Sequence, residues 1–118
     1  MSRFSKPIKV KFLNEADNYF GNLDSKVQKK FFVSFDKLQS GFKGKWFEPL
    51  RDGIWEFRQR DSQKFYRIYA FWDKTEEDET LVIGTHGFDK KSNKAPKSEI
   101  EKAKRIKEIY FKAKNKKK

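Results

Sequence analysis

Three runs of strand-forming residues follow one another between Ile54 and Phe88, and only short polar segments separate them. Turn signals lie at Asp61 and Ser62 and in the acidic segment 73–79. Strands joined by such short links pair antiparallel, because a parallel crossover needs a dozen or more residues. The sequence therefore predicts a three-stranded antiparallel meander over residues 54–60, 65–72 and 80–88.

The segments before the meander predict one strand and two helices. Residues 8–13 alternate apolar and basic side chains, which is typical of a half-buried strand. A short helix over 14–20 follows, and a longer helix begins near Asp24 or Ser25. Gly41 ends this second helix. Its apolar stripe consists of Val27, Phe31, Phe35 and Leu38, which recur at helical spacing.

The remaining segments complete an α+β fold. Residues 41–53 carry turn signals and are expected to form a loop, and Pro96 suits the first turn of a final helix. The expected order is β-α-α-β-β-β-α, with the N-terminal strand added to the meander and the helices packed on one face of the sheet. At 118 residues the chain is expected to be one domain, 1–118, ending in a basic tail at Lys114–Lys118.

The net charge is +12, and residues 89–118 hold 13 Lys and Arg against 4 Asp and Glu. Such an excess favours a polyanionic partner such as RNA, DNA or the ribosome, although a solvated lysine-rich helix is the simpler alternative. The absence of cysteine excludes disulfides and thiolate metal sites. No apolar run approaches the ~18–20 residues that span a bilayer, and the N-terminus lacks a secretory signal pattern. We therefore expect a cytoplasmic protein without a membrane partner.

Basic side chains are placed on the meander where a core strand would carry apolar ones. Period-two alternation puts Arg58, Arg60 and Arg67 on one face, with Tyr69 and the only histidine, His86, nearby. Such a cluster needs anions, which a phosphate ligand supplies. Cross-strand pairing, for example of Glu56 with Arg67, is the alternative.

The chemistry open to these residues is narrow. The sequence has no Ser-His-Asp set, metal cluster or nucleotide-binding fingerprint, so neither a metal nor a cofactor is expected. Arg, Lys, Tyr and His side chains can still cleave RNA without a metal, because RNA carries its own nucleophile, the 2′-hydroxyl. The protein has to align this hydroxyl with its phosphate, neutralise the phosphate charge and transfer two protons. His86 titrates near neutrality, but a lone histidine more often has a structural role. Lys90 and Lys91 follow it and either contact phosphate or lie in a solvated loop.

Three motifs carry a resemblance to a known family: L-R-D-G-I-W-E-F-R, F-Y-R-I-Y-A-F-W, and H-G-F-D-K-K-S-N-K-A-P-K-S-E-I-E-K-A. Together they resemble the phage-derived Gp49-like, HigB-type branch of the RelE/ParE toxin superfamily, over about residues 8–110. The resemblance implies a compact RelE-like fold and a type II toxin that acts as a ribosome-dependent, metal-independent mRNA endoribonuclease. It also implies the ribosome and mRNA as partners, with a cognate antitoxin, usually encoded next door, of the helix-turn-helix type.

The resemblance and the basic segments together predict the site residues. The expected catalytic residues are Arg58, Arg67, His86, Lys90 and Lys91. The expected RNA-binding residues are Lys43, Lys45, Arg60, Tyr69, Phe88 and Lys94, with Phe88 as a stacking side chain. Two alternatives remain on the same fold, a ParE-like inhibitor of DNA gyrase and a non-catalytic module that binds RNA or the ribosome.

Overall fold

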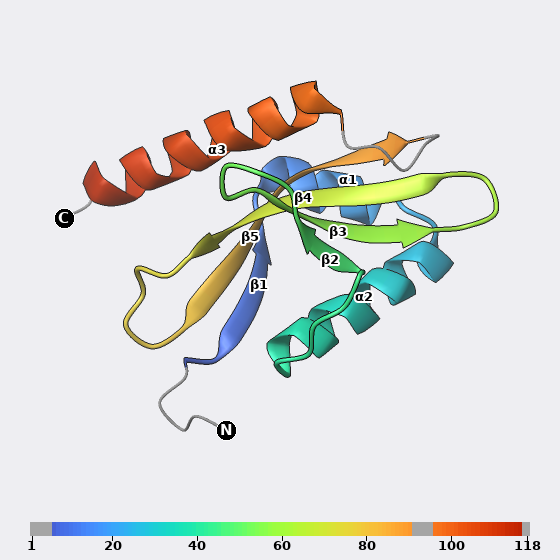
Figure 1. Cartoon of the computed structure of the whole chain (residues 1–118), viewed down its shortest axis with the longest axis horizontal. Helices are drawn as coiled ribbons and strands as arrows, with labels where there is room; N and C mark the ends of the chain where they lie inside the picture. Colours follow the sequence, from blue (N-terminus) through green and yellow to red (C-terminus); the bar gives the residue numbers. More distant parts are fainter. Residues whose placement is uncertain (1–5, 91–95, 117–118) are drawn as a thin grey trace.

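The computed structural model describes residues 6–90 and 96–116. Five strands and three helices form one layered α+β unit (Figure 1). In chain order they are β1 (Ile8–Phe12), α1 (Asn14–Gly21), α2 (Ser25–Gln39), β2 (Phe47–Pro49), β3 (Trp55–Arg60), β4 (Phe65–Asp73), β5 (Thr80–Lys90) and α3 (Lys97–Lys116). The α+β class is confirmed.

The strands form a single sheet in the order β1-β5-β4-β3-β2. β3, β4 and β5 pair antiparallel, so the predicted meander is confirmed. β1 joins the outer edge of β5 in parallel, which the two intervening helices and the meander make possible. A bulge between Tyr69 and Ala70 shifts the β4–β5 register. In the part of β4 before the bulge, Arg67 pairs with Phe88 and Tyr69 with His86.

The predicted loop at 41–53 contains a strand that the sequence prediction missed. β2 pairs antiparallel with β3 and forms the second edge of the sheet. It is only three residues long and ends on Pro49, which an edge strand tolerates because one side of its backbone needs no partner. Asp52 (φ 55°) and Gly53 (φ 78°) then turn the chain back into β3. The order of elements is therefore β-α-α-β-β-β-β-α.

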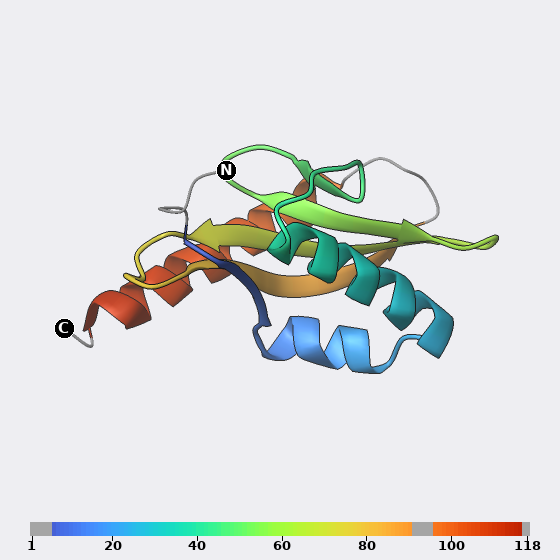
Figure 2. The same ribbon diagram turned by 90° about the horizontal axis from the view of Figure 1, so that it is seen from below.

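The expectation that all helices pack on one face is wrong. α1 and α2 cover a core that includes Phe57, Ile68 and Val82, whereas α3 covers a second core that includes Phe71 and Ile83. Figures 1 and 2 show α2 and α3 on opposite sides of the sheet. The physical reason is that β4 and β5 are apolar on both faces, so one layer of helices leaves the other face in water.

Helix α3 also extends further than expected. Lys114 lies inside the helix and not in a basic tail, and its ammonium pairs with Asp73 at 2.6 Å and with Glu76. Ile100 and Ala103 are buried against the sheet near the start of the helix. Within the described ranges, no helix combines the length and the apolar character needed to cross a bilayer.

Candidate functional site

A cavity of about 230 Å³ lies over β3 and β4 at the end of the sheet where these strands are joined by their hairpin turn. All three expected arginines, Arg58, Arg60 and Arg67, line it together. Strand pairing explains their convergence, because Arg58 lies opposite Arg67 and Arg60 lies opposite Phe65. The complete lining is Lys45, Arg58, Gln59, Arg60, Phe65 and Arg67.

Phe65 is the aromatic centre of this cavity, and the sequence prediction did not single it out. The guanidinium carbons of Arg60 and Arg67 lie 5.2 and 5.3 Å from the centroid of its ring. Cations at this distance are attracted to the ring face, which offsets part of their mutual repulsion. The signal was present in the sequence, since Phe65 lies two residues before Arg67 and therefore on the same face of the strand.

Arg67 is almost completely buried, at 1% exposure, and its Nε lies 2.7 Å from Glu56 Oε1 in an ion pair. Its Nη1 donates hydrogen bonds to the backbone oxygens of Tyr66 at 3.1 Å and Gln59 at 3.4 Å. Burial lowers the pKa of Arg67, and Glu56 opposes that shift. The cross-strand pairing of Glu56 with Arg67 is therefore confirmed, and a phosphate has to compete with Glu56 for this guanidinium.

Lys90 lies at the end of β5 opposite Phe65 and is 4% exposed. Burial, opposed by the charge of Glu56 and aided by the charges of Arg67 and Arg58, lowers the pKa of Lys90 to about 8. Within residues 6–90 and 96–116, its Nζ has no hydrogen-bond partner. Lys90 is thus not the solvated loop residue of the simpler interpretation. Lys91 and Lys94 lie outside the described residues.

His86 forms a buried junction between β5 and α3. One ring nitrogen, Nε2, lies 2.9 Å from Glu99 Oε1, and the other, Nδ1, lies 2.9 Å from Thr85 Oγ1. The ring stacks on Tyr69 at a centroid distance of 5.0 Å. Burial lowers the pKa of His86, although the Glu99 carboxylate opposes this effect. Glu99 is a partner that the sequence prediction missed, because no local pattern links residues on a strand and a later helix.

The other expected RNA-binding residues do not come together in one site. Tyr69 is fully buried, and burial raises the pKa of its hydroxyl, so in this conformation it supports the sheet and does not face solvent. Phe88 is half-buried, lies opposite Arg67 and packs against the core under α3. Lys43 lines a separate pocket, whereas Lys45 borders that pocket as well as the cavity.

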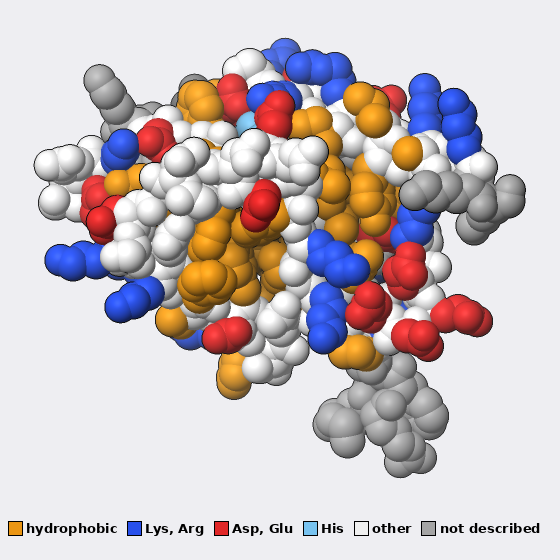
Figure 3. All heavy atoms as spheres, turned by 180° about the vertical axis from the view of Figure 1, so that it is seen from behind, with side chains coloured by type: hydrophobic (Ala, Val, Ile, Leu, Met, Phe, Trp, Pro, Cys, Tyr) orange, Lys and Arg blue, Asp and Glu red, His pale blue; other side chains and the backbone are white. Residues whose placement is uncertain are grey.

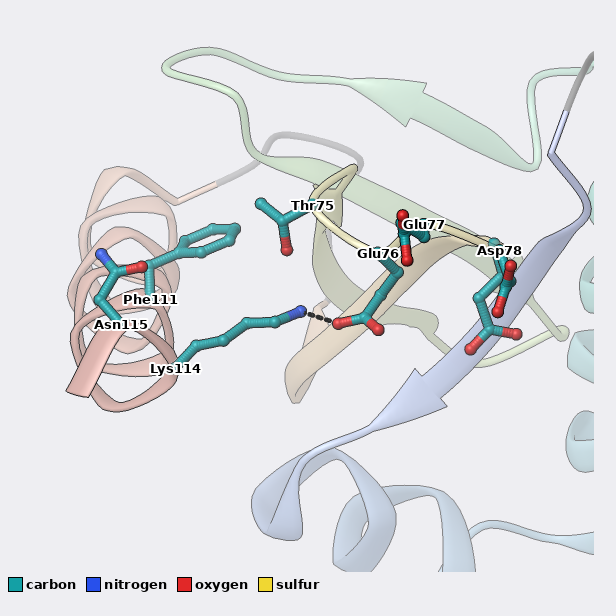
Figure 4. Close-up of a pocket in the computed structure, with 8 residues that line it drawn as sticks. Thr75, Glu76, Glu77, Asp78, Phe111, Lys114 and Asn115 are labelled. Carbon is teal, nitrogen blue, oxygen red and sulfur yellow. Dashed lines mark hydrogen bonds and ion pairs between the residues drawn. The ribbon is translucent and has the colours of Figure 1, made fainter. Parts of the chain in front are cut away.

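The opposite end of the sheet is acidic. Figure 4 shows a pocket between the β4–β5 turn and the last turns of α3, where Lys114 points toward Glu76. Its lining includes Glu76, Glu77, Asp78 and Glu79, which repel a phosphate backbone. Even so, no group of three or more His, Cys, Asp or Glu side chains among residues 6–90 and 96–116 is arranged to hold a metal ion. The basic cavity is therefore the stronger candidate for an anionic ligand.

Comparison with known proteins gives one match. The family described as phage derived protein Gp49-like (DUF891) matches residues 18–108, which include β3, β4, β5 and most of α3. No curated protein and no solved structure shows a significant match.

Proposed function

The chain belongs to the phage-derived Gp49-like family, and from this premise we propose that it cleaves mRNA on the ribosome as the toxin of a type II toxin–antitoxin pair. The family is part of the RelE/HigB-like toxin group, and membership indicates a toxin with a cognate antitoxin. The observation that carries the finer proposal is the convergence of Arg58, Arg60 and Arg67 around Phe65.

The proposed reaction uses the RNA's own nucleophile. The 2′-oxygen attacks the neighbouring phosphorus, its proton is removed, and the bond from phosphorus to the 5′-oxygen breaks as that oxygen takes up a proton. The products are a 2′,3′-cyclic phosphate and a 5′-hydroxyl. Negative charge grows on the phosphate oxygens during this step, and cations fixed in a cavity stabilise it. Arg58 and Arg60 are the cavity cations proposed for that role.

Lys90 is the proposed proton acceptor. With a pKa of about 8 it is neutral in about one molecule in ten at pH 7, whereas an ordinary lysine is neutral in fewer than one in a thousand. Because the side chain of Lys90 is buried, substrate reaches it only if the site rearranges.

The closed state of the site supports dependence on the ribosome. Arg67 is paired with Glu56, and Lys90 is buried, so free RNA meets a site in which these two cations are already paired or covered. When the ribosome holds one phosphate of the mRNA at the cavity, the free energy of that binding can offset the cost of rearranging Arg67 and Lys90. The same contact orients the 2′-hydroxyl for attack. Such a protein is a weak ribonuclease alone and a strong one when the message is held in place.

The test is translation in a purified system with the protein added, followed by primer extension on the mRNA. We expect codon-aligned cuts, and we expect Arg58→Ala to slow cutting by roughly 100-fold because one phosphate-stabilising cation is lost. Arg105→Ala is the matched control, since Arg105 is an exposed arginine on α3. Equal cutting by both variants would refute the assignment of the cavity.

A non-catalytic binding module is the second candidate, and the buried pairs favour it. Arg67 with Glu56 and His86 with Glu99 are arrangements that a purely structural role also explains. Inhibition of translation without cuts would support that reading. Intact mRNA together with blocked supercoiling of DNA would instead support a ParE-like gyrase inhibitor.

A further inference from the structure

A second pocket, of about 490 Å³, lies beside β2 on the face of the sheet that α2 covers. Its aromatic lining is Phe42, Trp46, Phe47, Trp55 and Trp72, so all three tryptophans of the chain border it. We call it the aromatic pocket. Trp55 stacks on Phe47 at 4.8 Å between ring centroids and meets Trp72 edge-on at 5.9 Å. These contacts hold the rings in fixed orientations.

The rim of the aromatic pocket is held by the backbone. At the end of α2, the N–H groups of Gly41 and Phe42 donate to the carbonyls of Leu38 at 2.9 Å and Lys37 at 2.8 Å, with Gly41 at φ 89°. This capping arrangement fixes the position of Phe42 while its ring remains 63% exposed. Gly44 lets the indole of Trp46 lie against the loop, because a Cβ there would come within 2.1 Å of its nitrogen.

Cations surround these rings. Lys43 and Lys45 line the aromatic pocket and are exposed, and Lys74 Nζ lies 5.6 Å from the ring centroid of Trp72. Glu48 adds one acidic side chain to the lining. Aromatic faces bordered by lysines are the combination that binds single-stranded nucleic acid, because bases stack on the rings while the cations contact phosphates.

The other apolar grooves lack this combination. Hydrophobic side chains are also exposed on the face of the molecule drawn in Figure 3, with both acidic and basic side chains beside them. The groove that contains Phe32 is bordered by Asp17. The groove that contains Ile109 has Glu76 and Glu79 as well as Lys11 and Lys114 in its lining, and Lys114 is paired with Glu76. Neither groove therefore has the excess of positive charge that favours a phosphate backbone.

The aromatic pocket and the basic cavity are neighbouring spaces near the β2 edge of the sheet. Lys45 lines both spaces. The carbonyl of Trp46, whose ring borders the pocket, accepts a 2.8 Å hydrogen bond from the backbone N–H of Arg58, whose side chain lines the cavity. One strand of RNA can therefore follow Lys45 from one space to the other.

We propose that the aromatic pocket is a nucleobase subsite for single-stranded RNA, where one base stacks against Phe42 and the tryptophans while Lys43 and Lys45 contact the flanking phosphates. The inference rests on the proposed function, because it concerns the strand whose phosphate enters the cavity at Arg58. Neither the family nor the cavity alone requires such a subsite.

The test is a fluorescence titration with 2′-O-methyl oligouridylate and 2′-O-methyl oligoadenylate, which lack the free 2′-hydroxyl and so stay intact. Since every tryptophan borders the pocket, a stacked base should quench the emission until the site is saturated. Phe42→Ala should raise the Kd about tenfold through lost stacking. Phe32→Ala is the matched control, because Phe32 is 53% exposed and borders a different groove.

The outcomes separate this inference from the proposed function. Unchanged emission, or a Kd that Phe42→Ala leaves unaltered, overturns the subsite even if codon-aligned cuts occur during translation. Equal weakening by Phe32→Ala overturns it as well. Quenching that depends on Phe42 supports the subsite even if no cuts occur, and in that case only the proposed cleavage fails. Circular dichroism of both variants shows that each is folded.

Discussion

Lys90 is held in a state that costs stability and serves the proposed chemistry. Its ammonium is buried, and its pKa falls to about 8 from an ordinary value of 10.5. Between these two values the unfolded chain binds more protons at this residue than the folded chain does. Stability therefore rises with pH through this interval, and the full penalty is present below pH 8.

We predict that Lys90→Met stabilises the protein at pH 7 by roughly 2–4 kcal/mol, because it removes a buried charge and keeps an apolar chain of similar length. The same variant should lose RNA cleavage. Urea denaturation at pH 7 and at pH 10 measures the first effect, and the advantage of the variant should shrink at the higher pH. An equal advantage at both values would show that Lys90 is not a perturbed lysine.

His86 gives a prediction that can be read directly, because it is the only histidine in the chain. Its ring is buried between Thr85 and Glu99, and burial lowers its pKa below the ordinary 6.5. An NMR titration of its single Cε1–H signal should therefore give a midpoint below 6.5. Glu99→Gln should lower that midpoint further, since it removes the carboxylate that favours the charged ring. A midpoint above 6.5 in the wild-type protein would contradict the buried junction.

At the scale of the elements, α3 is fastened to the sheet near both of its ends. His86 and Glu99 join it to β5 near its start, and Asp73 joins it to the end of β4. Asp73 is fully buried and accepts hydrogen bonds of 2.6 Å from both Tyr110 and Lys114. Burial alone would raise the pKa of Asp73, but these bonds and those from Thr75 hold it well below its ordinary value.

We predict that Asp73→Asn loosens the C-terminal half of α3 and lowers overall stability by roughly 1.5–3 kcal/mol, the range for hydrogen bonds to a charged group. Hydrogen exchange followed by mass spectrometry should show faster exchange over residues 105–116 and unchanged exchange in β4. Asp78→Asn is the control, because Asp78 is an exposed acid in the same turn. Equal exchange of α3 in both variants would contradict the anchoring role of Asp73.

The elements also show what sequence patterns reveal and what they leave out. The meander was predictable because period-two alternation and short turns are local signals. β2 was not, because a three-residue strand ending in proline carries too little pattern to separate from a loop. The side of the sheet on which α3 packs depends on the tertiary topology of the whole chain. The one indication in the sequence that helices cover both faces was that β4 carries apolar residues on both of its faces.

In the candidate site, too, only the features with a local sequence pattern could be predicted. The shared face of Arg58, Arg60 and Arg67 came from strand periodicity. The burial of Lys90 against β3 and β4 and the junction of His86 with Glu99 of α3 did not, because both depend on contacts between elements. Contacts between residues distant in sequence are set by tertiary packing, which no single-sequence pattern contains.

At the scale of the whole molecule, charge is separated along β4. The strand begins at Phe65 in the basic cavity and ends at Asp73 beside the acidic turn, and at about 3.3 Å per residue these points are roughly 26 Å apart. That separation exceeds the screening length of about 8 Å at physiological salt. An RNA strand would therefore be repelled only close to the acidic end and attracted only close to the basic cavity.

This polarity gives a test of which cations contact phosphate. The logarithm of the RNA affinity should fall linearly with the logarithm of the salt concentration, and each phosphate contact adds about 0.7 to the slope for a single strand. We predict that Lys43→Ala and Lys45→Ala each flatten the slope by about that amount in titrations with the oligouridylate.

Lys114→Ala should leave the slope unchanged, because Lys114 is paired with Asp73 and Glu76 at the acidic end and is not expected to contact a phosphate. All three variants lose one positive charge, so a general effect of net charge would flatten all three slopes equally. If the RNA strand instead contacts Lys43 and Lys45, only the slopes of those two variants should flatten. The reason is that the slope depends on the number of cations that contact phosphates and not on the total charge of the protein.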